Sequence, residues 1–250
     1  MRRILSANAI KWIAAAAMLL DHGATVLLGR YLIAQGISYM DPYVLGTPYL
    51  IFLLCRRIGR LAFPLYGFLL LEGFLHTSSR KRYAFRMGLM ALISEIPYDL
   101  VYYDTVLGFE GQNIFFTLLI GLLVMIGADA AKKQFGERDW KYYVSFAVCL
   151  ALGMTAAHFG KTDFLVPGVL MLGLMYFLCG FWTNTSALLG GAAALAAASL
   201  TPSQFVGCFA VIPVYFYNGK RGRGNTRIFY AFYPAHLLIL YALIKILPFG

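Results

Sequence analysis

Two segments of the sequence carry charged side chains inside stretches that are otherwise apolar. The first holds Asp21 followed directly by His22, and the second holds Arg56, Arg57 and Arg60. Histidine titrates close to neutrality, which makes it the usual general base, and a nearby carboxylate can orient it. Arginine does not lose its charge, so it needs an anion such as a carboxylate, a phosphate or a developing oxyanion. The pattern predicts proton transfer beside an anion site.

Four further polar residues lie in or beside apolar stretches. Glu95 is in the middle of one, close to a proline that is expected to kink its helix, and His236 lies in the final one. Glu72 lies toward the end of its stretch, where water can reach it. Asn113 begins another stretch, and its plain interpretation is a helix cap.

A structural interpretation accounts for part of this set without any ligand. Ion pairs from the arginines to Asp21, Glu72 or Glu95 would neutralise them, and a hydrogen-bonded Asp21 and His22 could hold helices together. A metal site is not predicted, because no local spacing of histidines supports one. The sequence also lacks a phosphate-binding loop and a dinucleotide fingerprint.

The composition indicates which solvent surrounds these residues. Of the 250 residues 60% are hydrophobic and 13% are charged, about half the usual charged share. So few charges cannot cover such a chain in water, and lipid is the solvent that fits. The net charge of +10 comes from short basic clusters between apolar stretches. That distribution is typical of membrane-protein loops and argues against nucleic-acid binding.

The elements that must position the polar residues are transmembrane helices. With about 20 apolar residues per crossing, nine helices are predicted, at residues 10–29, 46–77, 83–103, 113–131, 141–159, 163–181, 185–200, 203–218 and 228–247. We therefore expect an all-α, polytopic helix bundle forming one domain over residues 1–250. Asp21 and His22 then lie on the order of 16 Å deep, near the bilayer centre.

The basic residues predict the orientation of the bundle. If the N-terminus is cytoplasmic, 15 of the 21 lysines and arginines lie in cytoplasmic segments, three lie on the opposite side and three lie within residues 46–77. This asymmetry predicts a cytoplasmic N-terminus, an uncleaved first helix and an external C-terminus. The small residues at 190–199 predict close helix packing, and they are compatible with a homodimer without requiring one.

Several segments, in this order along the chain, resemble the TraX family of pilin N-acetylase-like proteins. The matching segments are Met18-Leu-Leu-Asp21-His22, Arg57-Ile-Gly59-Arg60-Leu-Ala-Phe63-Pro64, Ile93-Ser94-Glu95-Ile96-Pro97-Tyr98, Asn113-Ile-Phe-Phe-Thr117 and Tyr230-Ala-Phe-Tyr233-Pro234-Ala-His236. The resemblance extends over nearly the whole chain. A more distant similarity connects the family to the transmembrane acyltransferase superfamily, which includes enzymes that O-acetylate bacterial polysaccharides.

The resemblance implies a donor and a set of site residues. The donor is acetyl-CoA, bound from the cytoplasmic side of a bacterial-type cytoplasmic membrane. His22 corresponds to the catalytic histidine, Asp21 to its neighbour, and Arg57 and Arg60 to an arginine motif. The other residues expected to bind substrate or cofactor are Arg56, Glu72, Glu95, Asn113, Tyr233 and His236.

The expected function is transfer of an acetyl group to an amine or hydroxyl of a peptide or glycan acceptor. His22 would act as general base and the buried arginines would stabilise the oxyanion. Direct transfer and an acetyl-histidine intermediate both fit the sequence. Two other functions stay open: a transporter or channel with a buried charged pathway, and a non-catalytic assembly factor.

Overall fold

The protein is helical throughout the part that the structure describes. The structure is a computed structural model, and it describes residues 3–37, 46–181, 183–224 and 226–247. Within these ranges the only strand-like pairings are two isolated bridges. With α3 and α4 counted as one interrupted segment, the same ranges contain nine helical segments, and each overlaps one of the nine apolar stretches predicted from the sequence. The all-α class is confirmed.

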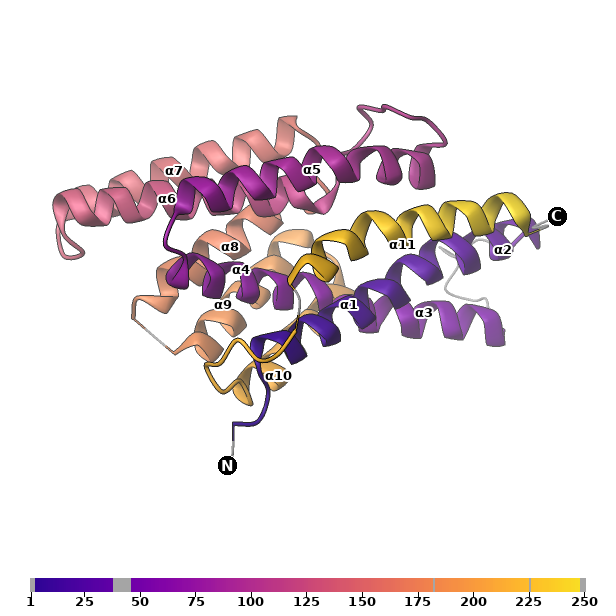
Figure 1. The fold of residues 1–250 in the computed structure, drawn as a ribbon, viewed down its shortest axis with the longest axis horizontal. Coiled ribbons are helices and arrows are strands. Elements are labelled where there is room, and N and C mark those ends of the chain that lie inside the picture. Colours follow the sequence, from indigo (N-terminus) through magenta and orange to yellow (C-terminus); the bar gives the residue numbers. More distant parts are fainter. Residues whose placement is uncertain (1–2, 38–45, 182, 225, 248–250) are drawn as a thin grey trace.

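The first and last helices lie in one layer with α3, the helix that begins at residue 47 (Figure 1). α1 (Ala7–Gly23) continues through a π-helical turn, η1 (Ala24–Leu28), into α2 (Gly29–Ala34). α3 (Thr47–Gly59) and α11 (Thr226–Ile246) both pack against α1 and η1. π-helical turns are rare and frequently occur at functional sites; this one begins directly after Gly23, which follows His22.

The segment predicted as one long helix at residues 46–77 is divided into two, which corrects that prediction. α3 ends at Gly59, and α4 (Ala62–His76) begins three residues later. In the break, the N–H groups of Arg60 and Leu61 bond three residues back, at 3.2 and 3.1 Å. Pro64 has no N–H to donate to the Arg60 carbonyl, but proline is tolerated in the first turn of a new helix. The break therefore places Arg60 between two helices.

The second half of the fold surrounds α4. α5 (Arg80–Tyr103), α6 (Ile114–Phe135) and α7 (Trp140–Phe159) follow one another as neighbours, and α8 (Leu165–Cys179) and α9 (Asn184–Ser199) pack together. α4 contacts α1, α6, α8 and α9. Its central position explains why its apolar side chains are buried on several faces.

The small residues near 190 serve packing within the chain. A Cβ atom added at Gly191 would lie 2.4 Å from Met175 of α8, so glycine permits the close approach of α9 to α8. The predicted close packing is confirmed. A 3₁₀ helix, η2 (Pro202–Ala210), and a short helix, α10 (Val211–Tyr215), then lead back to α11.

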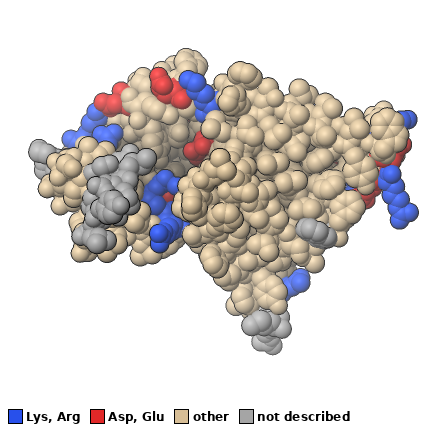
Figure 2. Space-filling model, turned by 180° about the vertical axis from the view of Figure 1, so that it is seen from behind, with Lys and Arg blue, Asp and Glu red and all other residues tan. Residues whose placement is uncertain are grey.

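Five segments of the described chain are long and apolar enough to cross a membrane. They are Ala7–Ala34, Thr47–His76, Ile114–Phe135, Trp140–Phe159 and Ile228–Ile246. Leu165–Cys179 and Pro202–Tyr215 are apolar but shorter. Figure 2 shows a broad uncharged centre on one face, with charged side chains gathered toward its ends. These features are those of a membrane protein, whereas nine crossings and their orientation stay predictions.

Contacts distant in sequence define two ends of the bundle. At one end the N-terminal segment pairs with the segment before α11, where Leu5 N donates to Phe216 O at 2.9 Å. At the other end Arg30 donates to the Val101 carbonyl at 3.3 Å, and Lys245 pairs with Asp104 at 2.8 Å. α1, α5 and α11 therefore run in the same direction. Such a parallel arrangement of α1 and α11 is expected if the chain crosses the bundle an odd number of times between them.

Candidate functional site

A pocket of about 180 Å³ lies where α1, the break between α3 and α4, α5 and α11 meet. Polar side chains from five parts of the chain line it: Asp21, His22, Arg56, Arg60, Asp163 and Tyr233. Aromatic rings of α4 and α5 supply much of the remaining wall. The pocket thus joins a possible base, two carboxylates and two guanidinium groups in a largely apolar surrounding.

His22, which lines the pocket, is hydrogen-bonded to His236, which lies outside the lining. His22 Nδ1 lies 2.8 Å from His236 Nε2, and His236 Nδ1 lies 2.8 Å from the carbonyl of Phe232, one turn earlier on α11. A carbonyl can only accept, so in the neutral pair His236 carries its proton on Nδ1 and accepts at Nε2. His22 must then donate from Nδ1. Its Nε2 is left as a basic nitrogen on a residue that lines the pocket.

Asp21 is held against the arginine segment rather than against His22. Its Oδ2 atom pairs with Arg56 at 2.8 Å. Thr25, in the π-helical turn, accepts from Arg56 at 2.8 Å and donates to the Asp21 carbonyl, also at 2.8 Å. The carboxylate lies directly over Gly59, where an added Cβ would come within 2.3 Å of the Asp21 side chain. The pair therefore depends on the close approach of α1 to the end of α3.

Arg60 lies on the other side of the pocket. Its Nε atom is buried and has no hydrogen-bond partner among the described residues. The carboxylates of Asp21 and Asp163 attract it, and Arg56 repels it. Asp163 belongs to the connection between α7 and α8, and its exposed side chain lines this pocket. Arg60 thus offers an unused donor in a site with charges of both signs.

The sequence-predicted residues separate into those that line the pocket and those that do not. Tyr233 lines the pocket, and its ring stands 6.0 Å from that of His22. His236 is buried, with 4% of its surface exposed, and reaches the pocket only through its contact with His22. Arg57 is exposed and does not line the pocket. Arg56 of α3 does line the pocket. It lies four residues, about one helical turn, before Arg60 and so points to the same side.

Glu95 and Asn113 form a separate buried contact between α5 and α6. Asn113 donates from its backbone N–H to Glu95 at 3.2 Å and from its side-chain amide to the same carboxylate. The side-chain oxygen of Asn113 also caps α6 by accepting from Phe115 N at 3.0 Å. Both residues are therefore engaged in fixing the corner between these helices, outside the pocket lining.

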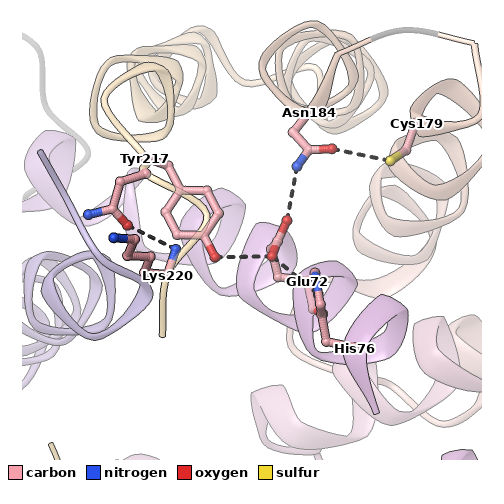
Figure 3. A network of polar contacts seen from close by, with 7 residues as sticks. Glu72, His76, Cys179, Asn184, Tyr217 and Lys220 are labelled. Carbon is pink, nitrogen blue, oxygen red and sulfur yellow. Dashed lines mark hydrogen bonds and ion pairs between the residues drawn. The ribbon is translucent and has the colours of Figure 1, made fainter. Parts of the chain in front are cut away.

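Glu72 belongs to a third network, drawn in Figure 3. Its carboxylate accepts from Asn184 at 2.9 Å and from Tyr217 at 3.1 Å, and it lies 3.5 Å from His76. These contacts tie α4 to α9 and to the segment after α10 (Figure 3). Glu72 does not line the pocket that contains His22.

Sequence reasoning missed Thr25 and Asp163 as well as three tyrosines that line the pocket, Tyr66, Tyr98 and Tyr102. Thr25 gave a weak signal, because it lies one turn after Asp21 on the same helix. Asp163 gave none, because an acidic residue at the edge of an apolar stretch is ordinary in a loop. Within the described residues, no group of three or more His, Cys, Asp or Glu side chains is arranged to hold a metal ion.

Comparisons with known proteins agree with the sequence motifs. The family model described as TraX protein matches residues 6–244. The chain is also 27% identical, over 262 residues and 94% of each chain, to a protein of Dichelobacter nodosus named probable fimbrial assembly protein FimC, serogroup H1. No solved structure matches the chain.

Proposed function

This chain belongs to the TraX family, and on that premise we propose that it is a membrane-embedded acetyltransferase. The donor is acetyl-CoA from the cytoplasm, and the acceptor is an amine or hydroxyl of a peptide or glycan. The observation that carries the proposal is the hydrogen-bonded chain from Phe232 through His236 to His22, which leaves a basic Nε2 beside two arginines.

In the proposed reaction His22 acts as the general base. The acceptor nitrogen or oxygen attacks the thioester carbonyl carbon as its proton passes to His22 Nε2. The carbon–sulfur bond of the tetrahedral intermediate then breaks, and the CoA thiolate takes that proton from His22. His236 is a positioning residue, because it holds the tautomer without touching the reacting atoms. General acid–base catalysis of this kind contributes about 10²–10⁴-fold to a rate.

Arg60 is the better candidate for the oxyanion. Arg56 is already paired with Asp21 and Thr25, whereas Arg60 Nε has no partner among the described residues. A buried unsatisfied donor costs about 1–3 kcal/mol, which an oxyanion bound there would recover. The pair of Asp21 and Arg56 would hold the arginine segment beside His22.

The proposal is tested by acetyl transfer from labelled acetyl-CoA with the purified chain in lipid nanodiscs. Peptide amines, amino sugars and polysaccharides serve as acceptors, and thiol release is measured in parallel. We expect His22→Ala to abolish transfer and His158→Ala to retain it, since His158 is exposed at the end of α7. Equal transfer by wild type and His22→Ala would falsify the role of His22. Label retained on the protein would distinguish an acetyl-histidine from direct transfer.

A non-catalytic assembly role is the second candidate, and the name of the Dichelobacter nodosus relative favours it. Under this alternative the polar pocket only holds helices together. Cells carrying His22→Ala would then support fimbrial assembly as well as wild-type cells at equal protein levels. Loss of assembly together with loss of acetylation would favour the enzyme.

A further inference from the structure

A second cavity, of about 390 Å³, opens at the end of the bundle where α1 and α11 begin. Three cationic side chains line it: Lys11 of α1, Arg86 of α5 and Arg221 of the segment before α11. No Asp or Glu occurs among the described residues that line it. Lys11 and Arg221 are close enough to repel each other.

Two of the three cations of this basic cavity lie near aromatic rings, and the third belongs to a segment whose backbone is hydrogen-bonded to the N-terminal segment. Lys11 Nζ lies 5.6 Å from the centre of the Phe229 ring, and the Arg86 guanidinium lies 5.8 Å from that of Tyr83. Arg221 belongs to a strap, residues 216–223, that is bonded to the N-terminal segment. Its own carbonyl accepts from Asn8 N at 3.0 Å. These contacts restrict the Lys11 and Arg86 side chains and so lower the entropy cost of binding a phosphate group.

The basic cavity lies next to the pocket of His22 along α4. Leu69, Leu70 and Gly73 line the cavity, Ala62 and Phe63 line the pocket, and Tyr66 lines both. Gly73 lies ten positions after Phe63, which corresponds to about 15 Å along the helix. A ligand with phosphates at one end and a long flexible arm could thus occupy both spaces, with its arm passing Tyr66.

We propose that the basic cavity binds the phosphate-bearing nucleotide end of the acyl donor, while the donor's arm passes Tyr66 to present the thioester to His22. This inference rests on the proposed function for the identity of the donor. Binding of the nucleotide end requires only the cations of the cavity, so it can be measured apart from the chemistry.

The first test measures CoA binding to the full chain in nanodiscs by equilibrium dialysis. Loss of one charge-assisted contact to phosphate weakens binding on the order of tenfold, so we expect that loss in Lys11→Gln and in Arg86→Gln. Arg86→Lys should recover part of it. Lys81→Gln is the matched control, because Lys81 is exposed on the same helix as Arg86 and does not line the cavity.

Acetylpantetheine, which lacks the phosphates, separates a phosphate site from damage to the fold. We expect its turnover to be equal in wild type, Lys11→Gln and Arg86→Gln, whereas KM for acetyl-CoA rises in both variants. Unchanged CoA affinity in both variants would overturn the inference. Equal loss of both donors would also overturn it, since the substitutions would then act through structure.

The outcomes also separate this inference from the proposed function. Binding of CoA that depends on Lys11 but leads to no acetyl transfer would support the cavity and defeat the enzyme. Acetyl transfer that depends on His22 but not on Lys11 or Arg86 would support the enzyme and overturn the binding of the donor in the basic cavity. Nanodiscs with and without phosphatidylglycerol identify the source of the phosphate: displacement of CoA by that lipid at equal ionic strength would assign the cavity to a lipid headgroup and overturn the donor site.

Tyr66 provides a test of the route between the two spaces. We expect Tyr66→Trp to keep the affinity for CoA while lowering kcat, because a displacement of about 1 Å at the reacting atoms can cost about 10²-fold. Tyr83→Trp, which enlarges a ring in the basic cavity alone, should instead lower the affinity for CoA. Unchanged kcat in Tyr66→Trp would overturn the proposed route.

Discussion

The contact between His22 and His236 gives each ring a separate part in the proposed chemistry. His236 is buried and bonded at both ring nitrogens, whereas His22 keeps Nε2 on the pocket side. The Phe232 carbonyl sets the direction of the whole chain of hydrogen bonds. Removal of His236 should therefore affect the orientation and tautomer of His22 without changing the acceptor or donor sites.

We predict that His236→Ala lowers kcat for acetyl transfer by about 10²–10⁴-fold, as expected when a catalytic histidine loses the group that fixes its tautomer. KM for acetyl-CoA should change little. His236→Gln should retain more activity, because its amide oxygen can accept from His22 Nδ1. Equal kcat values for the two variants, measured at equal protein levels, would contradict the positioning role.

The arginines provide a second prediction. Arg60→Gln should lower kcat by about 10²–10³-fold if Arg60 stabilises the oxyanion. Arg57→Gln should have little effect, because Arg57 is exposed and outside the pocket lining. The family resemblance implied a catalytic role for both residues, whereas only Arg60 lines the pocket. The kcat values of the two variants show which of these two assignments is correct. A large loss in Arg57→Gln alone would reject Arg60 as the residue that stabilises the oxyanion.

Charge inside apolar stretches was a useful but incomplete guide to the site. It singled out Asp21, His22 and Arg60, which the structure brings together. It also singled out Glu72 and Glu95, which have partners elsewhere. A buried charge shows that a partner is required, and only the fold shows whether that partner is another side chain or a ligand.

At the level of elements, two glycines beside the pocket have opposite roles. A Cβ at Gly59 would lie 2.3 Å from the side chain of Asp21, while a Cβ at Gly23 would meet nothing within 4 Å. Gly59 therefore permits the contact between α1 and α3. Gly23 serves no such packing purpose in the surroundings that the structure describes.

We predict that Gly59→Ala destabilises the protein by about 1–3 kcal/mol, because overpacking forces α3 away from α1. Acetyl transfer should fall as well, since the pair of Asp21 and Arg56 would be disturbed. Gly23→Ala is the matched control and should be neutral or stabilising by up to about 1 kcal/mol. Thermal unfolding in nanodiscs measures both, and a lower Tm for Gly23→Ala than for Gly59→Ala would refute the packing role of Gly59.

Helical segments were predictable because long apolar stretches in a membrane protein have few other backbone solutions. The interruption of residues 46–77 was not predicted, although Pro64 lies within it. Proline inside a transmembrane stretch often produces only a kink, so composition does not separate a kink from a break. The break depends on packing: a Cβ at Gly207 would stand 3.1 Å from the Arg60 carbonyl.

At the level of the whole molecule, the charge asymmetry predicts which end faces the cytoplasm. The connection between α4 and α5 should be cytoplasmic, and the loop between α5 and α6 should be external. The connection between α4 and α5 contains the exposed residue Ser78, and the loop between α5 and α6 contains the exposed residue Phe109. The shorter apolar segments Leu165–Cys179 and Pro202–Tyr215 would need a thinned bilayer region to cross the membrane.

We predict that a membrane-impermeant maleimide labels Phe109→Cys in intact cells, whereas it labels Ser78→Cys only after the membrane is opened. The unsubstituted chain, with its own four cysteines, serves as the background control. The opposite labelling pattern would reverse the orientation and place the basic cavity on the wrong side for a cytoplasmic donor. Labelling of both positions in intact cells would contradict the topology itself.

The pair of His22 and His236 joins residues that are 214 positions apart. During synthesis the first helix enters the membrane long before α11 has been translated. The proposed base therefore lacks its orienting partner until nearly all of the chain has been made. Fragments that end early would insert without becoming active. Because the two histidines are so far apart along the chain, catalysis would begin only when synthesis of the chain is nearly complete.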